Sequence, residues 1–94
     1  MRMLDPSSIV RKSANQVSCK LDEEVAILQM TDSLYYGLNE VGAHIWHLLD
    51  EPRSVQAICT AVSQQFEVSE EGCRGDVLGF LAALGDAGLI ESGA

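Results

Sequence analysis

The chain has 94 residues, 47% of them hydrophobic and 21% charged, which is typical of one globular domain with a single core. Its formal net charge of −8, with only six basic residues, disfavours binding to nucleic acid or to anionic membranes, so any partner attracted by charge would be basic. There is no secretory signal, no apolar run of about 20 residues and no disulfide-like cysteine spacing, so we expect a cytoplasmic protein whose residues 1–94 form a single domain.

The first part of the chain shows only a weak pattern. We expect residues 1–15 to be weakly structured, with at most a short extended piece at Ile9 and Val10. Three segments then have the alternation or the apolar content of β-strands, namely residues 16–21, 25–30 and 33–38. The first alternates apolar and polar side chains, which predicts a half-buried strand, and the second is apolar on both faces, which predicts a central strand. The short turns between them predict an antiparallel meander with two edge strands.

After the third strand, apolar residues recur at helical spacing in three stretches. Their members are Val41, Ile45, Leu48 and Leu49 in the first, Val55, Ile58, Val62 and Phe66 in the second, and Cys73, Val77, Phe80, Leu81 and Leu84 in the third. Asn39, Ser54 and Ser69 stand directly before these stretches, where a short polar side chain can accept a hydrogen bond from the first turn of a helix. We therefore predict three helices, and we expect the apolar tail Leu89-Ile90 to pack back on the core. The predicted fold class is α+β, a winged helix-turn-helix-like domain with a three-stranded antiparallel sheet followed by three helices.

A winged helix suggests DNA binding, but the charges of this chain argue against that function. The third helix would be the one that reads DNA, and it opens with Ser69-Glu70-Glu71 and has only Arg74 as a basic neighbour. Affinity for DNA that is independent of sequence comes from Lys and Arg side chains on phosphates. We therefore keep the predicted fold and discard the DNA-binding function.

The sequence holds no pattern typical of an active site. It has no recognisable Ser/His/Asp or Cys/His arrangement, no glycine-rich phosphate loop and no paired carboxylates. His44 and His47 share a helix face, but zinc needs at least a third ligand, and Cys59 and Cys73 qualify only if the fold brings them near. All three cysteines are expected to be small core residues. We predict no catalytic residue, no metal site and no cofactor.

The third predicted strand lacks the features that normally protect the edge of a sheet. Natural edge strands are blunted by Lys, Pro or inward-pointing charges, and residues 33–38 contain none of these. One interpretation is that the N-terminal segment, a helix or a second copy of the chain covers this edge. The other is strand addition, in which an extended peptide pairs its backbone with the edge and its side chains enter pockets between the sheet and a helix.

The junction between this strand and the first helix resembles a known family. The resemblance lies in a Leu-Asn-x-x-Gly-x-x-Ile-Trp run within Tyr35-Tyr36-Gly37-Leu38-Asn39-Glu40-Val41-Gly42 and Ile45-Trp46, and in Leu49, Val68, Asp76-Val77, Leu84 and Gly88-Leu89-Ile90. Over residues 16–91 this pattern resembles the PqqD-like family, the leader-peptide recognition domains (RiPP recognition elements) of ribosomally made, post-translationally modified peptides. Within the family, the chain looks most like the stand-alone leader-binding protein of lasso-peptide pathways.

The resemblance implies a non-catalytic adaptor that binds the leader of a precursor peptide as an added antiparallel strand. Carried over by position, the peptide-binding residues lie on the third strand and the third helix: Leu34, Tyr35, Tyr36, Gly37, Leu38, Arg74, Asp76, Val77, Leu78 and Leu81. Asp76 could meet a basic side chain of the leader or cap structure. The resemblance also implies a separate modifying enzyme, which in a lasso pathway would be a leader peptidase. The adaptor itself is expected to be a monomer or a weak homodimer.

Two alternatives remain open at this point. One is the peptide chaperone of pyrroloquinoline quinone (PQQ) biosynthesis, which works with a radical SAM enzyme, although its equivalent of the Tyr35-Tyr36 stretch is less aromatic. The other is a structural module in which the third strands of two copies pair across a two-fold axis. A leader titration and a measurement of oligomeric state distinguish the peptide-binding functions from the structural one.

Overall fold

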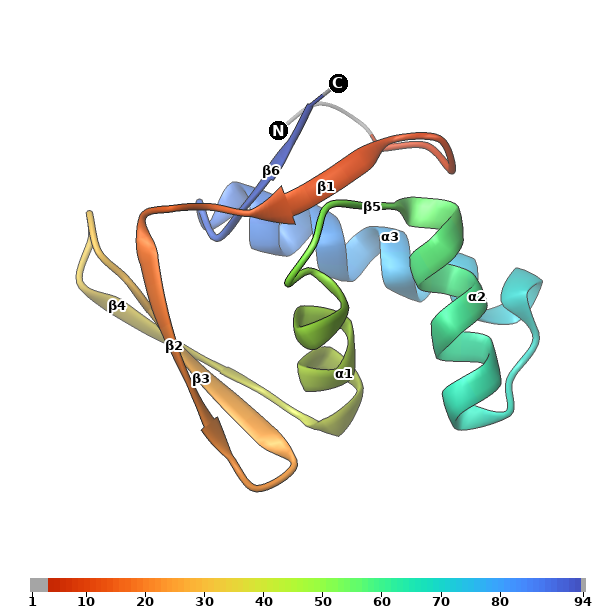
Figure 1. Cartoon of the computed structure of the whole chain (residues 1–94), viewed down its shortest axis with the longest axis horizontal. Coiled ribbons are helices and arrows are strands. Elements are labelled where there is room, and N and C mark those ends of the chain that lie inside the picture. The colour runs from red at the N-terminus through yellow and green to blue at the C-terminus, as the bar shows by residue number, and fades with distance from the viewer. Residues whose placement is uncertain (1–3, 94) are drawn as a thin grey trace.

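The structure is a computed structural model that describes residues 4–93, so residues 1–3 of the N-terminal segment and residue 94 lie outside it. Within this range the chain forms six strands and three helices (Figure 1). In chain order the elements are β1 (Ile9–Lys12), β2 (Gln16–Leu21), β3 (Glu24–Gln29), β4 (Leu34–Leu38), α1 (Glu40–Leu48), β5 (Arg53–Ser54), α2 (Val55–Phe66), α3 (Glu70–Asp86) and β6 (Ile90–Ser92). The predicted α+β class is confirmed. No helix in the described part of the chain is both long and apolar enough to span a membrane.

The predicted meander is confirmed, with strand order β2-β3-β4 and antiparallel pairing throughout. β3 is the central strand, and its alternate residues Val25, Ile27 and Gln29 are buried. The amide of Gln29 is an unusual core group. Its side-chain oxygen accepts a hydrogen bond from the Asp32 N–H at 2.7 Å, which fixes the turn that leads into β4.

A second three-stranded sheet, of order β5-β1-β6, is absent from the sequence-based prediction. Residues 9–12, which the sequence pattern placed in a weakly structured segment with at most a short extended piece, form its central strand, β1. The apolar tail packs on the core as expected, since Leu89 and Ile90 are both buried, and it continues as β6. The pairing joins the two ends of the chain, as Lys12 lies opposite Ile90.

Each helix begins where its capping residue predicts. The side chains of Asn39, Ser54 and Ser69 accept hydrogen bonds from the backbone N–H groups three residues ahead, at 2.9, 3.1 and 2.9 Å. These bonds satisfy donors that the first turn of a helix leaves without a partner. The start of each helix is therefore set locally by the sequence.

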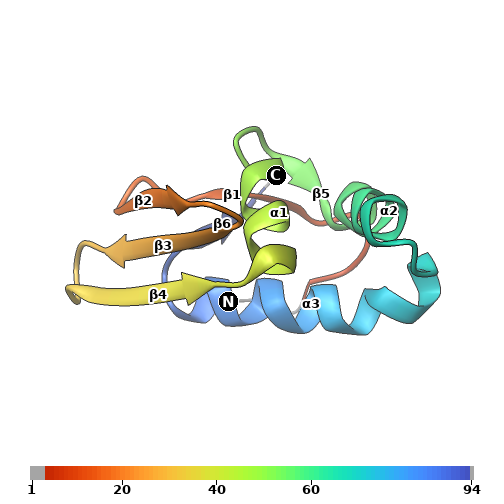
Figure 2. The same cartoon turned by 90° about the horizontal axis from the view of Figure 1, so that it is seen from below.

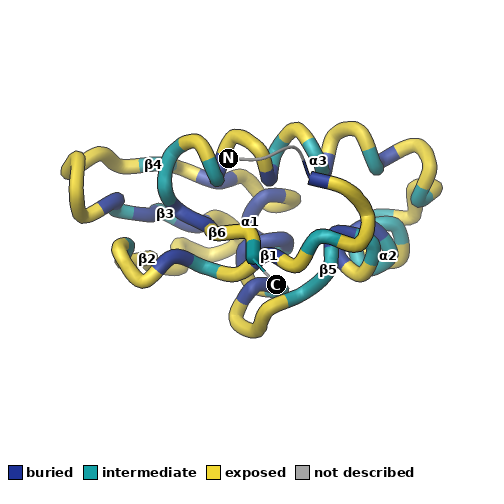
Figure 3. Tube along the Cα trace, turned by 90° about the horizontal axis from the view of Figure 1, so that it is seen from above, coloured by how far each residue is buried: buried dark blue, intermediate teal, exposed yellow. Residues whose placement is uncertain are grey.

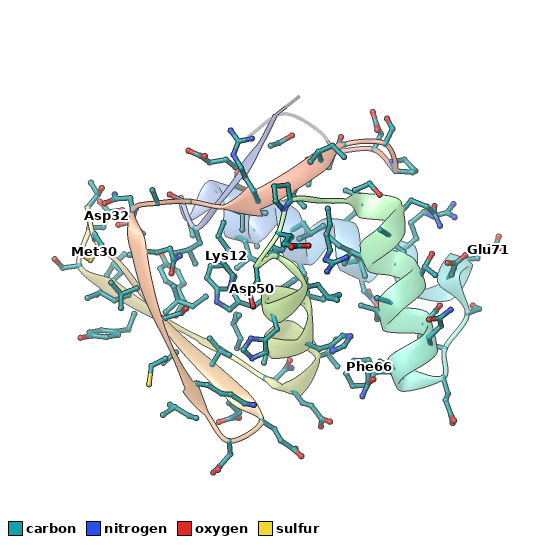
Figure 4. The ribbon with its side chains drawn as sticks, in the orientation of Figure 1. Lys12, Met30, Asp32, Asp50, Phe66 and Glu71 are labelled. Atoms are coloured by element: carbon teal, nitrogen blue, oxygen red, sulfur yellow. The ribbon has the colours of Figure 1, made fainter. Side chains whose placement is uncertain are left out.

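The core lies between the β2-β3-β4 sheet, the three helices and β1 (Figures 1 and 2). Its largest fully buried side chain is Trp46 of α1. Above the indole ring lies the ammonium group of Lys12 from β1, 4.6 Å from the ring centroid, and this group is also bonded to Asp50 (Figure 4). The hydrogen bond from Lys12 lowers the pKa of Asp50 below its ordinary value. This cluster ties the second sheet to α1.

The burial of β2 differs from the prediction. The segment was expected to be half-buried through Val17, Cys19 and Leu21, but all three side chains are exposed, and β2 is exposed along most of its length (Figure 3). Residues that lie directly opposite each other on two paired strands point to the same face of the sheet. Val17 lies opposite Leu28 of β3, so it points away from the face that contains the buried residues of β3. The expectation that all three cysteines are core residues is thus wrong for Cys19, whereas Cys59 and Cys73 are buried.

Candidate functional site

The outer edge of β4 is free within residues 4–93, since β3 is the strand that pairs with it. β4 lies on the same side of the domain as α3 (Figures 2 and 3). The described part of the N-terminal segment pairs elsewhere, because β1 belongs to the other sheet. The sequence analysis left open whether the N-terminal segment or a helix covers this edge. Among the described residues, no segment pairs with it.

The hydrogen bonding of β3 reveals which of its residues pair with β4. The N–H of Met30, directly after β3, donates to the carbonyl of Asn15 at 3.1 Å, on the β2 side. Successive residues of a strand direct their backbone groups to opposite sides, so the even-numbered residues of β3 pair with β2 and the odd-numbered ones with β4. Opposite the odd-numbered residues lie Leu34, Tyr36 and Leu38.

Tyr35 and Gly37 therefore direct their backbone N–H and C=O groups out of the sheet. Both residues are exposed, and the side chain of Tyr35 is 76% accessible. The edge thus offers two donors and two acceptors in the alternating order of an antiparallel ladder. Neither Lys nor Pro, nor any charged side chain, stands on β4 to prevent pairing.

A pocket of about 350 Å³ lies at the C-terminal end of this edge. Its lining comes from all three helices and the α2–α3 connection, and consists of Val41, Gly42, Ile45, Val62, Phe66, Val68, Gly72, Cys73, Asp76, Val77 and Phe80. The lining is apolar except for one carboxylate, that of Asp76, which is exposed. Val41 and Val68 are also largely exposed, at 41% and 47%, which is unusual for apolar residues unless something packs against them.

The pocket is joined to β4 by a close approach between α1 and α3. A Cβ atom added to Gly42 would lie 3.1 Å from the ring of Phe80 and 3.3 Å from the Cβ of Leu38. Glycine at this position thus allows the last residue of β4, the start of α1 and the middle of α3 to meet. The pocket therefore lies beyond the C-terminal end of β4, close to Leu38.

The structure brings together only some of the residues expected to bind peptide. On β4, Leu38 is buried and Tyr36 half-buried, whereas Leu34, Tyr35 and Gly37 are exposed. On α3, Asp76 and Val77 line the pocket, and Leu81 is fully buried in the core.

Arg74 and Leu78 lie on the other flank of α3. Helical geometry separates them from Asp76 and Phe80 by the buried stripe of α3, and neither belongs to the pocket lining. The charge of Arg74 acts on the thiol of Cys59, which also places it on the α2 side.

The pocket residues from α1 and α2 are missing from the sequence-based site. Val41, Ile45, Val62 and Phe66 were recognised only as members of helical apolar stripes. Phe80 was likewise assigned to the stripe of α3, although it is only half-buried. The width of the apolar stripe on each helix is a usable signal for such residues. Where the stripe is wider than the part that contacts the core, its outermost side chains can line a groove.

Within residues 4–93, no group of three or more His, Cys, Asp or Glu side chains could hold a metal ion. Burial raises the pKa of the Cys59 thiol, so it stays protonated in the core. His44 packs edge-on against Phe66, with ring centroids 5.6 Å apart, and supports the wall of the pocket.

His44 should make the domain sensitive to mild acid. Burial, and to a lesser extent the nearby His47, lowers the pKa of His44 below its ordinary value, and its Nε2 is buried without a partner among the described residues. The folded state therefore binds fewer protons than the unfolded state. The contribution of His44 to stability is complete above its ordinary pKa of 6.5 and is lost as the pH falls below that value.

We expect urea unfolding at about pH 7.5 and about pH 5.5 to show a loss of stability at the lower pH that is smaller in His44→Gln. An unchanged pH dependence in this variant would contradict the assignment.

Comparison with known proteins identifies the family of this chain. The family described as Coenzyme PQQ synthesis protein D (PqqD) matches residues 24–90, more than half of the 94-residue chain. The chain belongs to the PqqD family. The match includes both β4 and α3, the elements that border the edge and the pocket of this PqqD-family protein.

Two solved structures share its fold. TbiB1, solved in complex with the TbiA(beta) leader peptide, is 33% identical, with a TM-score of 0.82 over 89% of this chain and 98% of TbiB1. The PqqD truncation of Methylobacterium extorquens PqqCD, described as a functional and stand-alone RiPP recognition element, is 17% identical, with a TM-score of 0.76 over 94% of each chain. At that identity the second match shows a likeness of fold. None of the curated proteins compared with the chain matches it.

Proposed function

We propose that this PqqD-family protein is a non-catalytic adaptor that binds the leader of a ribosomally made precursor peptide. The observation on which the proposal depends is the free, unprotected edge of β4 beside an apolar pocket. Strand addition needs both features, because the backbone ladder supplies affinity for any extended chain and the pocket selects among side chains. Membership of the family and the likeness to TbiB1, which was solved with a leader peptide, support the same function.

The geometry predicts how the leader lies. Its backbone pairs antiparallel with Tyr35 and Gly37, and because the pocket is at the C-terminal end of β4, the N-terminal part of the bound segment reaches the pocket. A large apolar side chain fits the lining there. Asp76, the single charged residue of the lining, would favour a basic neighbour in the leader.

We further propose that the precursor belongs to a lasso-peptide pathway and that the bound leader is presented to a leader peptidase. The aromatic Tyr35-Tyr36 stretch favours this assignment over the PQQ chaperone, and the identity to the PqqD truncation, 17% against 33% for TbiB1, also disfavours that chaperone. The adaptor would raise the local concentration of precursor at the enzyme, which is the effect of tethering. The free state of all three cysteines agrees with a reducing, cytoplasmic setting.

The test is a titration with a labelled leader peptide encoded beside the gene, followed by fluorescence anisotropy. Saturable binding by a monomeric domain supports the proposal. A stable dimer in sedimentation that ignores the peptide would instead support the structural module. Binding of a PQQ precursor, together with a radical SAM enzyme as partner, would move the assignment to the PQQ chaperone.

A charge at the mouth of the pocket should weaken leader binding without harming the fold. Val41 is 41% exposed and lies in the first turn of α1, where the helix dipole favours a carboxylate, so Val41→Asp should fold normally. In the complex, this carboxylate would be desolvated against an apolar side chain. We expect the Kd for the leader to rise by about tenfold or more.

The matched control for this variant is Gln64→Glu, which adds the same charge at an exposed position of α2 outside the pocket lining. It should bind the leader like the wild type. Equal affinities for all three proteins would show that the pocket does not contact the leader.

A further inference from the structure

A second pocket, of about 290 Å³, shares a wall with the apolar pocket at the end of β4. We call it the polar pocket and define it by its lining, which comes from β2, the β2–β3 turn, α1 and the end of α2: Lys20, Asp22, Glu23, Glu40, Ala43, His44, His47, Gln65 and Phe66. Phe66, the last residue of α2, is the side chain common to the two linings (Figure 4). A change in the polar pocket that moves Phe66 therefore changes the shape of the apolar pocket.

The imidazole of His44 supports Phe66 from the side of the polar pocket. The centroids of the two rings are 5.6 Å apart, and their planes meet at 87°. Phe66 stands at the end of α2 and is only half-buried. A half-buried ring at the end of a helix has fewer neighbours to hold it than a ring in the core, so the contact with His44 helps to set the position of Phe66.

His44 fits this position only as a neutral ring. Its Nε2 is buried and has no hydrogen-bond partner among the described residues. Burial and, to a lesser extent, the nearby His47 lower the pKa of His44 below its ordinary value. An imidazolium donates from both ring nitrogens, so a charged His44 in this position would hold a buried N–H without an acceptor.

The charges of the polar pocket favour movement of a protonated His44 away from Phe66. The titratable residues that share the pocket with His44 come from its own helix and from β2 and the β2–β3 turn, whereas the α2 side is uncharged: Glu40, His47, Lys20, Asp22 and Glu23. Carboxylates outnumber cations among them. In the described part of the chain, no hydrogen bond or ion pair joins His44 to any of these carboxylates. A protonated His44 therefore gains a carboxylate partner only by turning out of its contact with Phe66.

We propose that His44 is a positioning residue for leader binding, and that its protonation releases Phe66 from the wall against which the leader packs. The inference rests on the proposed function, in which a leader side chain fills the apolar pocket. The leader then binds the state with neutral His44 more tightly than the protonated state. Because a single proton is involved, the affinity falls by at most about tenfold per pH unit, and by reciprocity a bound leader makes His44 harder to protonate.

The first measurement is the Kd of the labelled leader for the full chain at about pH 7.5, about pH 6.5 and about pH 5.5, with circular dichroism to establish the fold at each pH. We expect the Kd of the wild type to rise about threefold or more from the highest pH to the lowest. His44→Phe keeps a ring against Phe66, loses no hydrogen bond at Nε2 and cannot be protonated, so its Kd should stay constant over this range. His44→Gln lacks the ring and should bind the leader more weakly than His44→Phe at each pH.

The matched control is His47→Gln, which removes an exposed titratable side chain from the same pocket and leaves the contact between His44 and Phe66 in place. Its Kd should depend on pH like that of the wild type. A Kd that is independent of pH in the wild type, or that rises equally in the wild type and in His44→Phe, would overturn this inference.

The second measurement is the pKa of His44 in the wild type, from the NMR signals of its imidazole protons with and without saturating leader. We expect the leader to lower this pKa by about 0.5 or more. An unchanged pKa together with normal leader binding at about pH 7.5 would overturn this inference alone. A wild type that fails to bind leader at that pH would overturn the proposed function as well.

Discussion

Tyr35→Pro is expected to fold like the wild type and to bind the leader at least about tenfold more weakly. The N–H of Tyr35 points out of the sheet, so its loss removes no hydrogen bond of the folded domain. In the complex it removes one donor to the leader, and the proline ring stands where the leader backbone must approach. Circular dichroism and a thermal melt establish the fold, and fluorescence anisotropy measures the affinity.

Two controls separate backbone pairing from other effects. Tyr35→Thr loses the same aromatic side chain but keeps the N–H, and it should retain most of the affinity. Tyr36→Pro removes an N–H that is directed at β3, opposite Ile27, and should destabilise the fold itself. If Tyr35→Pro folded and bound the leader like the wild type, strand addition at β4 would be rejected.

Trp46→Ala is expected to have the largest effect on stability. The indole is 1% exposed, lies at the centre of the core and supports the ammonium group of Lys12 from the second sheet. Truncation of a buried aromatic residue costs about 3–5 kcal/mol, a large part of the about 5–15 kcal/mol that stabilises a typical domain. We expect a marginally folded or unfolded protein, measured by urea unfolding followed by far-UV circular dichroism.

Trp46→Phe tests whether this effect comes from packing. The Nε1 atom of Trp46 is buried without a hydrogen-bond partner among the described residues, so phenylalanine loses no hydrogen bond and leaves only a smaller cavity. It should cost about 1–2 kcal/mol and should keep leader binding. A cost for Trp46→Phe equal to that for Trp46→Ala would contradict a packing role and point to a specific need for the indole.

The prediction for Tyr35 combines one feature that the sequence shows and one that it does not show. That β4 is an unprotected strand could be inferred from its residues alone, because Lys, Pro and charges are absent there. That Tyr35 rather than Tyr36 directs its N–H outward depends on the register of β2, β3 and β4 together. A strand's alternation indicates which side chains share a face, but not which backbone groups meet a neighbour.

The helix side of the site shows the same division. The predicted stripe of α3 is confirmed for Cys73, Val77, Leu81 and Leu84, which are all buried, whereas its fifth member, Phe80, is half-buried. Which flank of that stripe borders the pocket was not determined, and Arg74 and Leu78 lie on the flank away from it. Helical period fixes a residue's angle around its own axis, but the direction of the pocket depends on where α1 and α2 pack.

The sequence by itself determined the local elements of this protein: three helices with their polar caps, the β2-β3-β4 meander and the edge without protection. These follow from interactions within a few residues along the chain, namely capping, hydrophobic period and turn chemistry. Only the tertiary structure decided the β5-β1-β6 sheet, the side of β2 that faces solvent and the lining of the pocket. Each of these depends on contacts between segments far apart in sequence, such as Lys12 with Ile90, for which a single strand or helix holds no local signal.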